Sequence, residues 1–69
     1  MKVSARNTLP GVVKNIKRGA VNAEVTLEVA PGLTIVPVIT LDAVKSLGLK
    51  KGKIAYAVIK ASSVIVGVD

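Results

Sequence analysis

Apolar and polar side chains alternate most clearly over residues 22–29. The apolar positions are Ala23, Val25, Leu27 and Val29, and the polar positions are Asn22, Glu24, Thr26 and Glu28. This period of two predicts a strand with one buried face and one face in water. Residues 11–19 show the pattern less cleanly and also predict a strand, with the bend between the two strands at residues 18–20.

Proline and glycine mark the next boundaries. Residues 30–32 predict a turn, because Pro31 presets its φ and Gly32 can adopt the positive φ of a type II turn. Residues 33–40 then predict a strand that is apolar on both faces. Since Pro37 cannot donate a ladder hydrogen bond, we expect this strand to lie at a sheet edge or to carry a bulge.

The only helix candidate covers residues 40–49. Thr40 suits the N-cap, Asp42 lies in the first turn, where the helix dipole favours a carboxylate, and Gly48 would end the helix.

A final hairpin is predicted after a turn at residues 50–53. Residues 54–60 and 64–68 are both rich in β-branched side chains, and neither segment has a polar face. Tyr56 shares a face with aliphatic neighbours, so we expect it in the core.

Together these elements predict a mainly β protein. Their order favours a small OB-like β-barrel of five to six strands with one short helix, forming a single domain over residues 1–69. A domain of this size is marginally stable alone, and without cysteine it has no disulfide. Strands that are apolar on both faces also need a covering surface, so we expect an oligomer.

Composition then narrows the chemistry. With no His, no Cys and four carboxylates that have no evident partners, the chain is not expected to be an enzyme or to hold a metal cation, although a Ser-Lys pair at residues 60–63 is formally available. The net charge of +6 leaves nucleic acid as an alternative, but a single aromatic residue offers little base stacking. The chain has neither a signal sequence nor a long apolar run, so we expect a cytoplasmic protein without membrane contact.

Three small polar segments carry the remaining signal. Residues 4–7 read SARN, residues 60–63 read KASS, and residues 18–22 read RGAVN, all without an acidic residue. Backbone N–H groups, hydroxyls, amides and cations around small side chains are the donors that a tetrahedral oxyanion needs. Each segment alone is also typical of an ordinary bend, turn or solvated strand end.

In combination, SARN, RGAVNAEV and IKASSV, in this order and spacing, resemble the molbindin or Mop family of small molybdate- and tungstate-binding proteins. The resemblance extends over essentially the whole chain. It implies an OB-like barrel assembled as a hexamer, a trimer of dimers, with oxyanions bound between subunits. It also implies a function in intracellular molybdenum storage and homeostasis, with molybdopterin binding as the alternative. The net charge keeps a basic nucleic-acid-binding OB module as a further, less favoured alternative.

The same resemblance implies two types of oxyanion site. In the first, residues 4–7 of one chain face residues 60–62 of another, which gives the ligand set Ser4, Ala5, Arg6, Asn7, Lys60, Ala61 and Ser62. In the second, the RGAVN turn repeats near a threefold axis, which gives Gly19, Val21 and Asn22.

Overall fold

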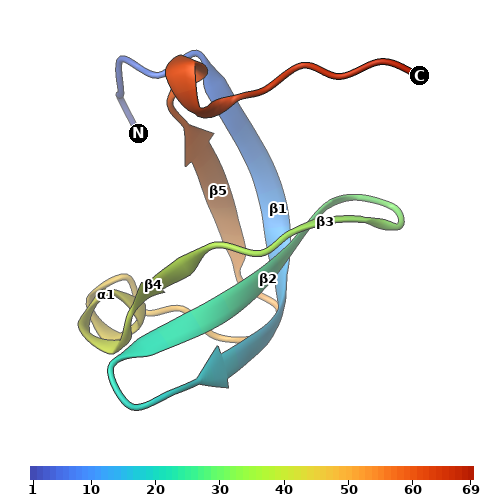
Figure 1. Ribbon diagram of the computed structural model, residues 1–69. Coiled ribbons are helices and arrows are strands. Elements are labelled where there is room, and N and C mark those ends of the chain that lie inside the picture. Colours follow the sequence, from blue (N-terminus) through green and yellow to red (C-terminus); the bar gives the residue numbers. More distant parts are fainter.

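A computed structural model describes residues 1–69 as one antiparallel sheet of five strands with a short helix (Figure 1). The elements are β1 (Asn7–Arg18), β2 (Asn22–Ala30), β3 (Leu33–Ile35), β4 (Val38–Thr40), α1 (Leu41–Ser46), β5 (Ile54–Ile59) and the 3-10 turn η1 (Ala61–Ser63). The strand order is β3-β2-β1-β5, and β4 also pairs with β2. The helix is too short to cross a membrane.

Strand β1 is longer than expected, because it begins at Asn7 and not at residue 11. Its pairing with β2 begins at Val12, so at Pro10 it is paired only with β5, and a residue without an N–H can face the open side. Gly11 is buried where β1 approaches β2, and a Cβ there would lie 2.9 Å from the Glu28 carbonyl oxygen. The Pro-Gly pair therefore permits a close strand crossing instead of ending the strand.

The proline in the expected strand 33–40 divides it into β3 and β4. Both short strands pair with β2, and the Pro37 carbonyl accepts a hydrogen bond from the Val25 N–H at 2.9 Å. The turn before β3 has Gly32 at φ +73°, which confirms the predicted positive φ. The expected edge position is confirmed, because β3 and β4 each pair only with β2, but the single strand expected over residues 33–40 is two short strands.

The helix has the predicted ends. The Thr40 hydroxyl oxygen accepts a hydrogen bond from the Ala43 N–H at 3.0 Å, and Gly48 follows the helix with φ +61°. Lys53 adds a feature that the pattern did not reveal, because its Nζ donates to the carbonyls of Leu47 at 2.8 Å and Gly48. A cation on the last carbonyls of a helix is favourable.

The core is small and wholly apolar. It consists of Val13, Ala23, Val25, Leu27, Val44 and Ala57. Tyr56, which was expected in this core, is 52% exposed, so that expectation was wrong. Alternation could not decide the inward face of β5, because both of its faces are apolar; the small side chain of Ala57 is the one that packs inward.

Residues 64–68 form no strand within the chain, which corrects the predicted final hairpin. After β5 the chain enters η1, where the Ser63 N–H bonds the Lys60 carbonyl and the Val64 N–H bonds the Ala61 carbonyl. Beyond this turn the segment extends away from the body of the molecule (Figure 1). β-branched residues favour an extended backbone, but they do not supply a partner strand.

The core makes a direct stability prediction. Replacing the buried Leu27 with alanine should lower the free energy of unfolding by about 2–5 kcal/mol, because the lost side chain leaves a cavity. Leu33→Ala is the matched control, since Leu33 is 58% exposed, and should change it by no more than about 0.5 kcal/mol. Urea denaturation at equal protein concentration measures both, and equal losses would contradict this assignment of the core.

Candidate functional site

Two of the small polar segments meet at one end of the sheet. A surface hollow of about 570 Å³ is lined by Val3, Ser4, Ala5, Arg6, Val58, Lys60 and Ala61. Residues 4–6 and 60–61 of the same chain therefore lie together, whereas the resemblance placed these segments on different chains. A single chain thus already combines a hydroxyl, two cations and small residues in one place.

Strand pairing explains this meeting. β1 and β5 are antiparallel, and Asn7 at the start of β1 pairs with Ile59 at the end of β5. The residues just before β1 must then lie beside those just after β5. The Asn7 side chain adds a bond across the pair, from its Nδ2 to the Ile59 carbonyl at 3.4 Å.

Some expected members of the site lie outside the hollow, and two apolar residues join it. Asn7 and Ser62 do not line it; Asn7 instead ties β1 to β5, and Ser62 lies in η1. Val3 and Val58 form apolar walls that the polar pattern did not identify. The only available signal was their position next to the polar segments.

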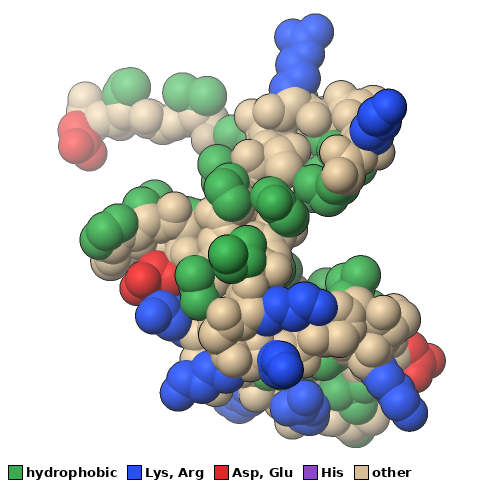
Figure 2. Space-filling model, turned by 180° about the vertical axis from the view of Figure 1, so that it is seen from behind, with side chains coloured by type: hydrophobic (Ala, Val, Ile, Leu, Met, Phe, Trp, Pro, Cys, Tyr) green, Lys and Arg blue, Asp and Glu red, His purple; other side chains and the backbone are tan.

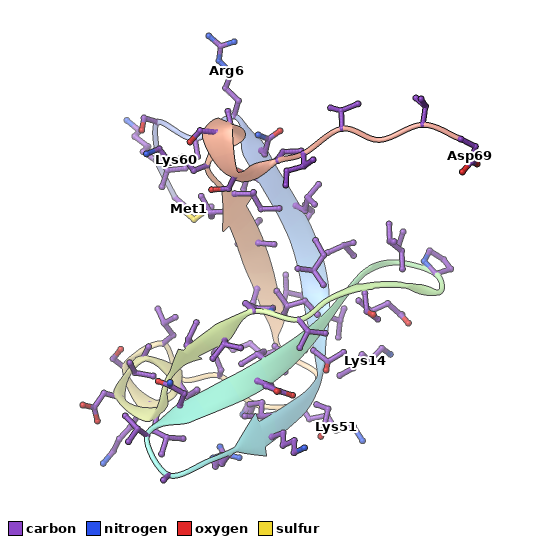
Figure 3. All side chains as sticks on the ribbon, viewed as in Figure 1. Met1, Arg6, Lys14, Lys51, Lys60 and Asp69 are labelled. Atoms are coloured by element: carbon purple, nitrogen blue, oxygen red, sulfur yellow. The ribbon has the colours of Figure 1, made fainter.

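The donors of this hollow are unused within the chain. Arg6 and Lys60 are exposed, and neither they nor Ser4 forms a side-chain hydrogen bond or an ion pair; the only ion pair, Lys14 to Glu28 at 3.7 Å, lies elsewhere. Figure 3 shows Arg6 pointing away from its own chain. No acidic side chain lines the hollow, so its local charge is positive.

The hollow is open and wide for a small anion. Its volume of about 570 Å³ is in the range of pockets for drug-sized molecules. An oxyanion of a few atoms cannot contact all of its walls at once. Tight binding of such an ion would need a second surface that approaches from the solvent side.

The third polar segment lies at the far end of β1. A smaller hollow of about 200 Å³ is lined by Lys17, Arg18, Gly19, Asn22, Ala23, Glu24 and Val38. The turn is closed by a hydrogen bond from the Gly19 N–H to the Asn22 carbonyl at 2.8 Å. Gly19 and Asn22 therefore line this hollow as expected, but Val21 does not and is 69% exposed.

Charge at the second hollow is mixed. Lys17 and Arg18 add cations that the motif alone did not include, and Glu24 adds one carboxylate. Figure 2 shows Lys and Arg side chains spread over this part of the molecule between exposed apolar atoms, and further Lys and Arg side chains at its opposite end. No cluster of His, Cys, Asp or Glu could hold a metal cation in either hollow.

A five-stranded sheet with one short helix and two donor-rich surface hollows defines a small ligand-binding β domain. The chain belongs to the TOBE domain family, which matches residues 3–66. It is 51% identical to a "Probable molybdenum-pterin-binding protein" of Haemophilus influenzae, with both chains covered completely.

Solved structures agree with this membership. MopII from Clostridium pasteurianum superimposes with a TM-score of 0.90 at 45% identity, covering 97% of this chain and 100% of that one. The cytoplasmic molybdate-binding protein ModG, solved with molybdate bound, gives a TM-score of 0.93 at 56% identity; it covers all of this chain, which spans 49% of ModG. These similarities confirm the expected resemblance to Mop proteins and the OB-like fold.

Proposed function

We propose that this chain binds molybdate, and tungstate as its chemical analogue, as a cargo for intracellular molybdenum storage and homeostasis. The observation that carries the proposal is the hollow in which Ser4, Arg6 and Lys60 meet without a carboxylate and with their donors unused. The similarity of this whole chain to 49% of ModG, whose structure contains molybdate, supports the choice of ion.

The first site would hold the dianion by charge and geometry. Arg6 and Lys60 provide charge-assisted hydrogen bonds, which are stronger than neutral ones. The hydroxyls of Ser4 and Ser62 and the N–H groups around Ala5 and Ala61 would complete a tetrahedral donor set, because small side chains let the backbone approach the ion. Asn7 acts in this scheme by fixing the β1–β5 junction.

This first site is proposed to lie between chains of a homo-oligomer, a hexamer built as a trimer of dimers. Two features support a second chain: the hollow is too wide for one small ion, and Arg6 points outward, where its own chain offers no partner (Figure 3). The second site type, with Gly19, Val21 and Asn22, would form where turns from three chains meet. Within it, Val21 would contact a neighbouring chain, since it is exposed in one copy.

Rigid donors also give a basis for selectivity. A cage sized for molybdate would contact the smaller sulfate ion loosely, because donors fixed by two chains cannot follow the ion inward. We further propose that the protein acts in the cytoplasm as a single-domain carrier without catalytic activity. An ion held between chains stabilises the assembly by mass action.

Molybdopterin is the second candidate cargo. The name of the Haemophilus influenzae relative favours it, and so do the apolar walls Val3 and Val58 of a hollow large enough for a small organic molecule. Titration with molybdate and with a molybdenum-free pterin, monitored by calorimetry, separates the two candidates. A nucleic-acid role is disfavoured because Tyr56 is the only aromatic side chain.

Removing either cation should weaken molybdate binding. A hydrogen bond to a charged group contributes about 1.5–3 kcal/mol, so Arg6→Ala or Lys60→Ala should raise the Kd roughly tenfold to a hundredfold. Lys45→Ala is the control, since Lys45 lies on α1 and lines neither hollow, and its substitution removes the same charge. Isothermal titration calorimetry measures all three, and a Kd for Arg6→Ala equal to that of the control would refute the assignment of Arg6.

Native mass spectrometry tests the assembly and the choice of ion together. With molybdate we expect a hexamer that gains discrete ion masses, whereas an excess of sulfate should add none. A monomer, or an oligomer that takes up both anions equally, would contradict the intersubunit cage.

The second site type has its own test. Asn22→Ala should remove a subset of the bound ions and leave those at the first site, because the two hollows share no lining residue. The ion count per hexamer, from the same mass spectra, measures this. Loss of all ions, or of none, would argue against two independent site types.

A further inference from the structure

One acidic residue distinguishes the two polar hollows. Glu24 is the only carboxylate that lines either of them. The first hollow has two cations, Arg6 and Lys60, and no carboxylate, so its charge is +2. In the second, Glu24 cancels one of the two cations, Lys17 and Arg18, which leaves a charge of +1. The RGAVN segment alone did not show this difference, because it contains no acidic residue.

The sheet places Glu24 in the second hollow. Alternate residues of a strand face the same side, so Glu24 lies on the same face of β2 as Asn22. It pairs with Lys17 of β1 on one side and with Val38 of β4 on the other, and all of these residues line the hollow. β4 runs beside β2 at this end of the sheet (Figure 1). The position of Glu24 is therefore set by three paired strands.

The charge of Glu24 has no partner within the chain. The residue is exposed, and its side chain forms no hydrogen bond. It forms no ion pair with Lys17 either, although directly opposed residues have Cβ atoms about 5 Å apart. The single ion pair of the chain joins Lys14 to Glu28. Glu24 therefore presents an unpaired carboxylate to whatever occupies the hollow.

A carboxylate opposes the binding of an oxyanion such as molybdate. Both groups only accept hydrogen bonds, so no hydrogen bond can join them. An ion in a hollow of about 200 Å³ also lies close to every lining group, well inside the ionic screening length of about 8 Å in physiological salt. The like charges of the ion and Glu24 therefore repel each other with little screening.

We propose that Glu24 sets the affinity of the second site type by repelling the bound dianion, so that a neutral side chain at this position gives tighter molybdate binding. This inference deepens the proposed function and rests on it. Where the turns of three chains meet, three Glu24 carboxylates would face one ion, and the repulsion would be larger than in a single chain. The carboxylates would make this ion easier to release.

Glu24→Gln tests the proposal with almost no change of shape. Native mass spectra, recorded over a series of molybdate concentrations, give the concentration that half-fills each set of ions. The second set is the one that Asn22→Ala removes. In Glu24→Gln its half-filling concentration should fall roughly threefold to tenfold, because a like charge close to the ion is lost. The first set should fill at an unchanged concentration.

Two further variants separate charge from shape. Glu28→Gln is the matched control, since Glu28 lies on the same strand and lines neither hollow. Its position four residues from Glu24, about 13 Å along the strand, is beyond the screening length, so neither set of ions should change. Glu24→Lys reverses the charge and should lower the half-filling concentration of the second set further than Glu24→Gln does.

Ionic strength gives an independent readout. Salt weakens attraction between exposed charges, and Glu24→Gln raises the charge of the hollow from +1 to +2. The affinity of the second set should therefore fall more steeply with added sodium chloride in Glu24→Gln than in the natural chain. A change in packing alone would not alter this slope.

The possible results point to different conclusions. If the half-filling concentration of the second set is unchanged or higher in Glu24→Gln, the role assigned to Glu24 is wrong, while molybdate binding and the proposed function stand. Loss of the natural assembly in this variant would mean that Glu24 serves contacts between chains, and would equally overturn the proposal. Absence of bound molybdate from the natural chain would instead reject the proposed function, and this inference with it.

Discussion

The antiparallel pairing of β1 with β5 is the interaction on which the structure depends. It brings together two segments, residues 3–6 and 60–61, that lie at opposite ends of the sequence, and it leaves the other edge of β5 open. The site and the unfinished side of the barrel are therefore two results of one strand pair. Asn7 marks the junction, since its side chain bonds the last residue of β5.

The fold leaves a large apolar surface exposed on this short chain. Its buried side chains are few and mostly Val and Ala, while Ile54, Tyr56 and the segment after η1 remain exposed. An apolar surface of this extent is unusual on a protein that works alone. In the proposed oligomer, stability and ligand binding would depend on neighbouring contacts between chains, because the apolar segment 64–68 follows directly on the polar residues of the site.

Sequence patterns predicted the fold best where a pattern of residues was compatible with only one local structure. The alternation over residues 22–29 gave β2, and Thr40 and Gly48 gave the helix ends. The inward face of β5 could not be predicted, because both of its faces are apolar. A strand at residues 64–68 was expected from their β-branched composition, but composition does not show which strand they would pair with. The expected strand began only at residue 11, whereas β1 begins at Asn7. The close approach of β1 to β2 at Gly11 is visible only in the structure.

For the site, the polar segments indicated the donors but not their grouping. Ser4, Arg6 and Lys60 could be named from their type and their small neighbours, whereas Val3 and Val58 gave no signal until strand pairing placed them in the same hollow. Val21 belongs to the RGAVN segment that was expected to form the second site, yet it does not line the second hollow. Spacing along the chain therefore identifies the polar donor residues of a site more readily than the other residues that line the same hollow.

The length of β1 has a further electrostatic consequence. The two hollows lie at opposite ends of this strand of 12 residues, in a molecule whose longest extent is 36 Å. Ionic screening acts over about 8 Å in physiological salt, so a dianion in one hollow exerts almost no repulsion on a dianion in the other hollow of that chain. If both hollows bind anions as proposed, charge repulsion within one chain does not prevent both from being filled.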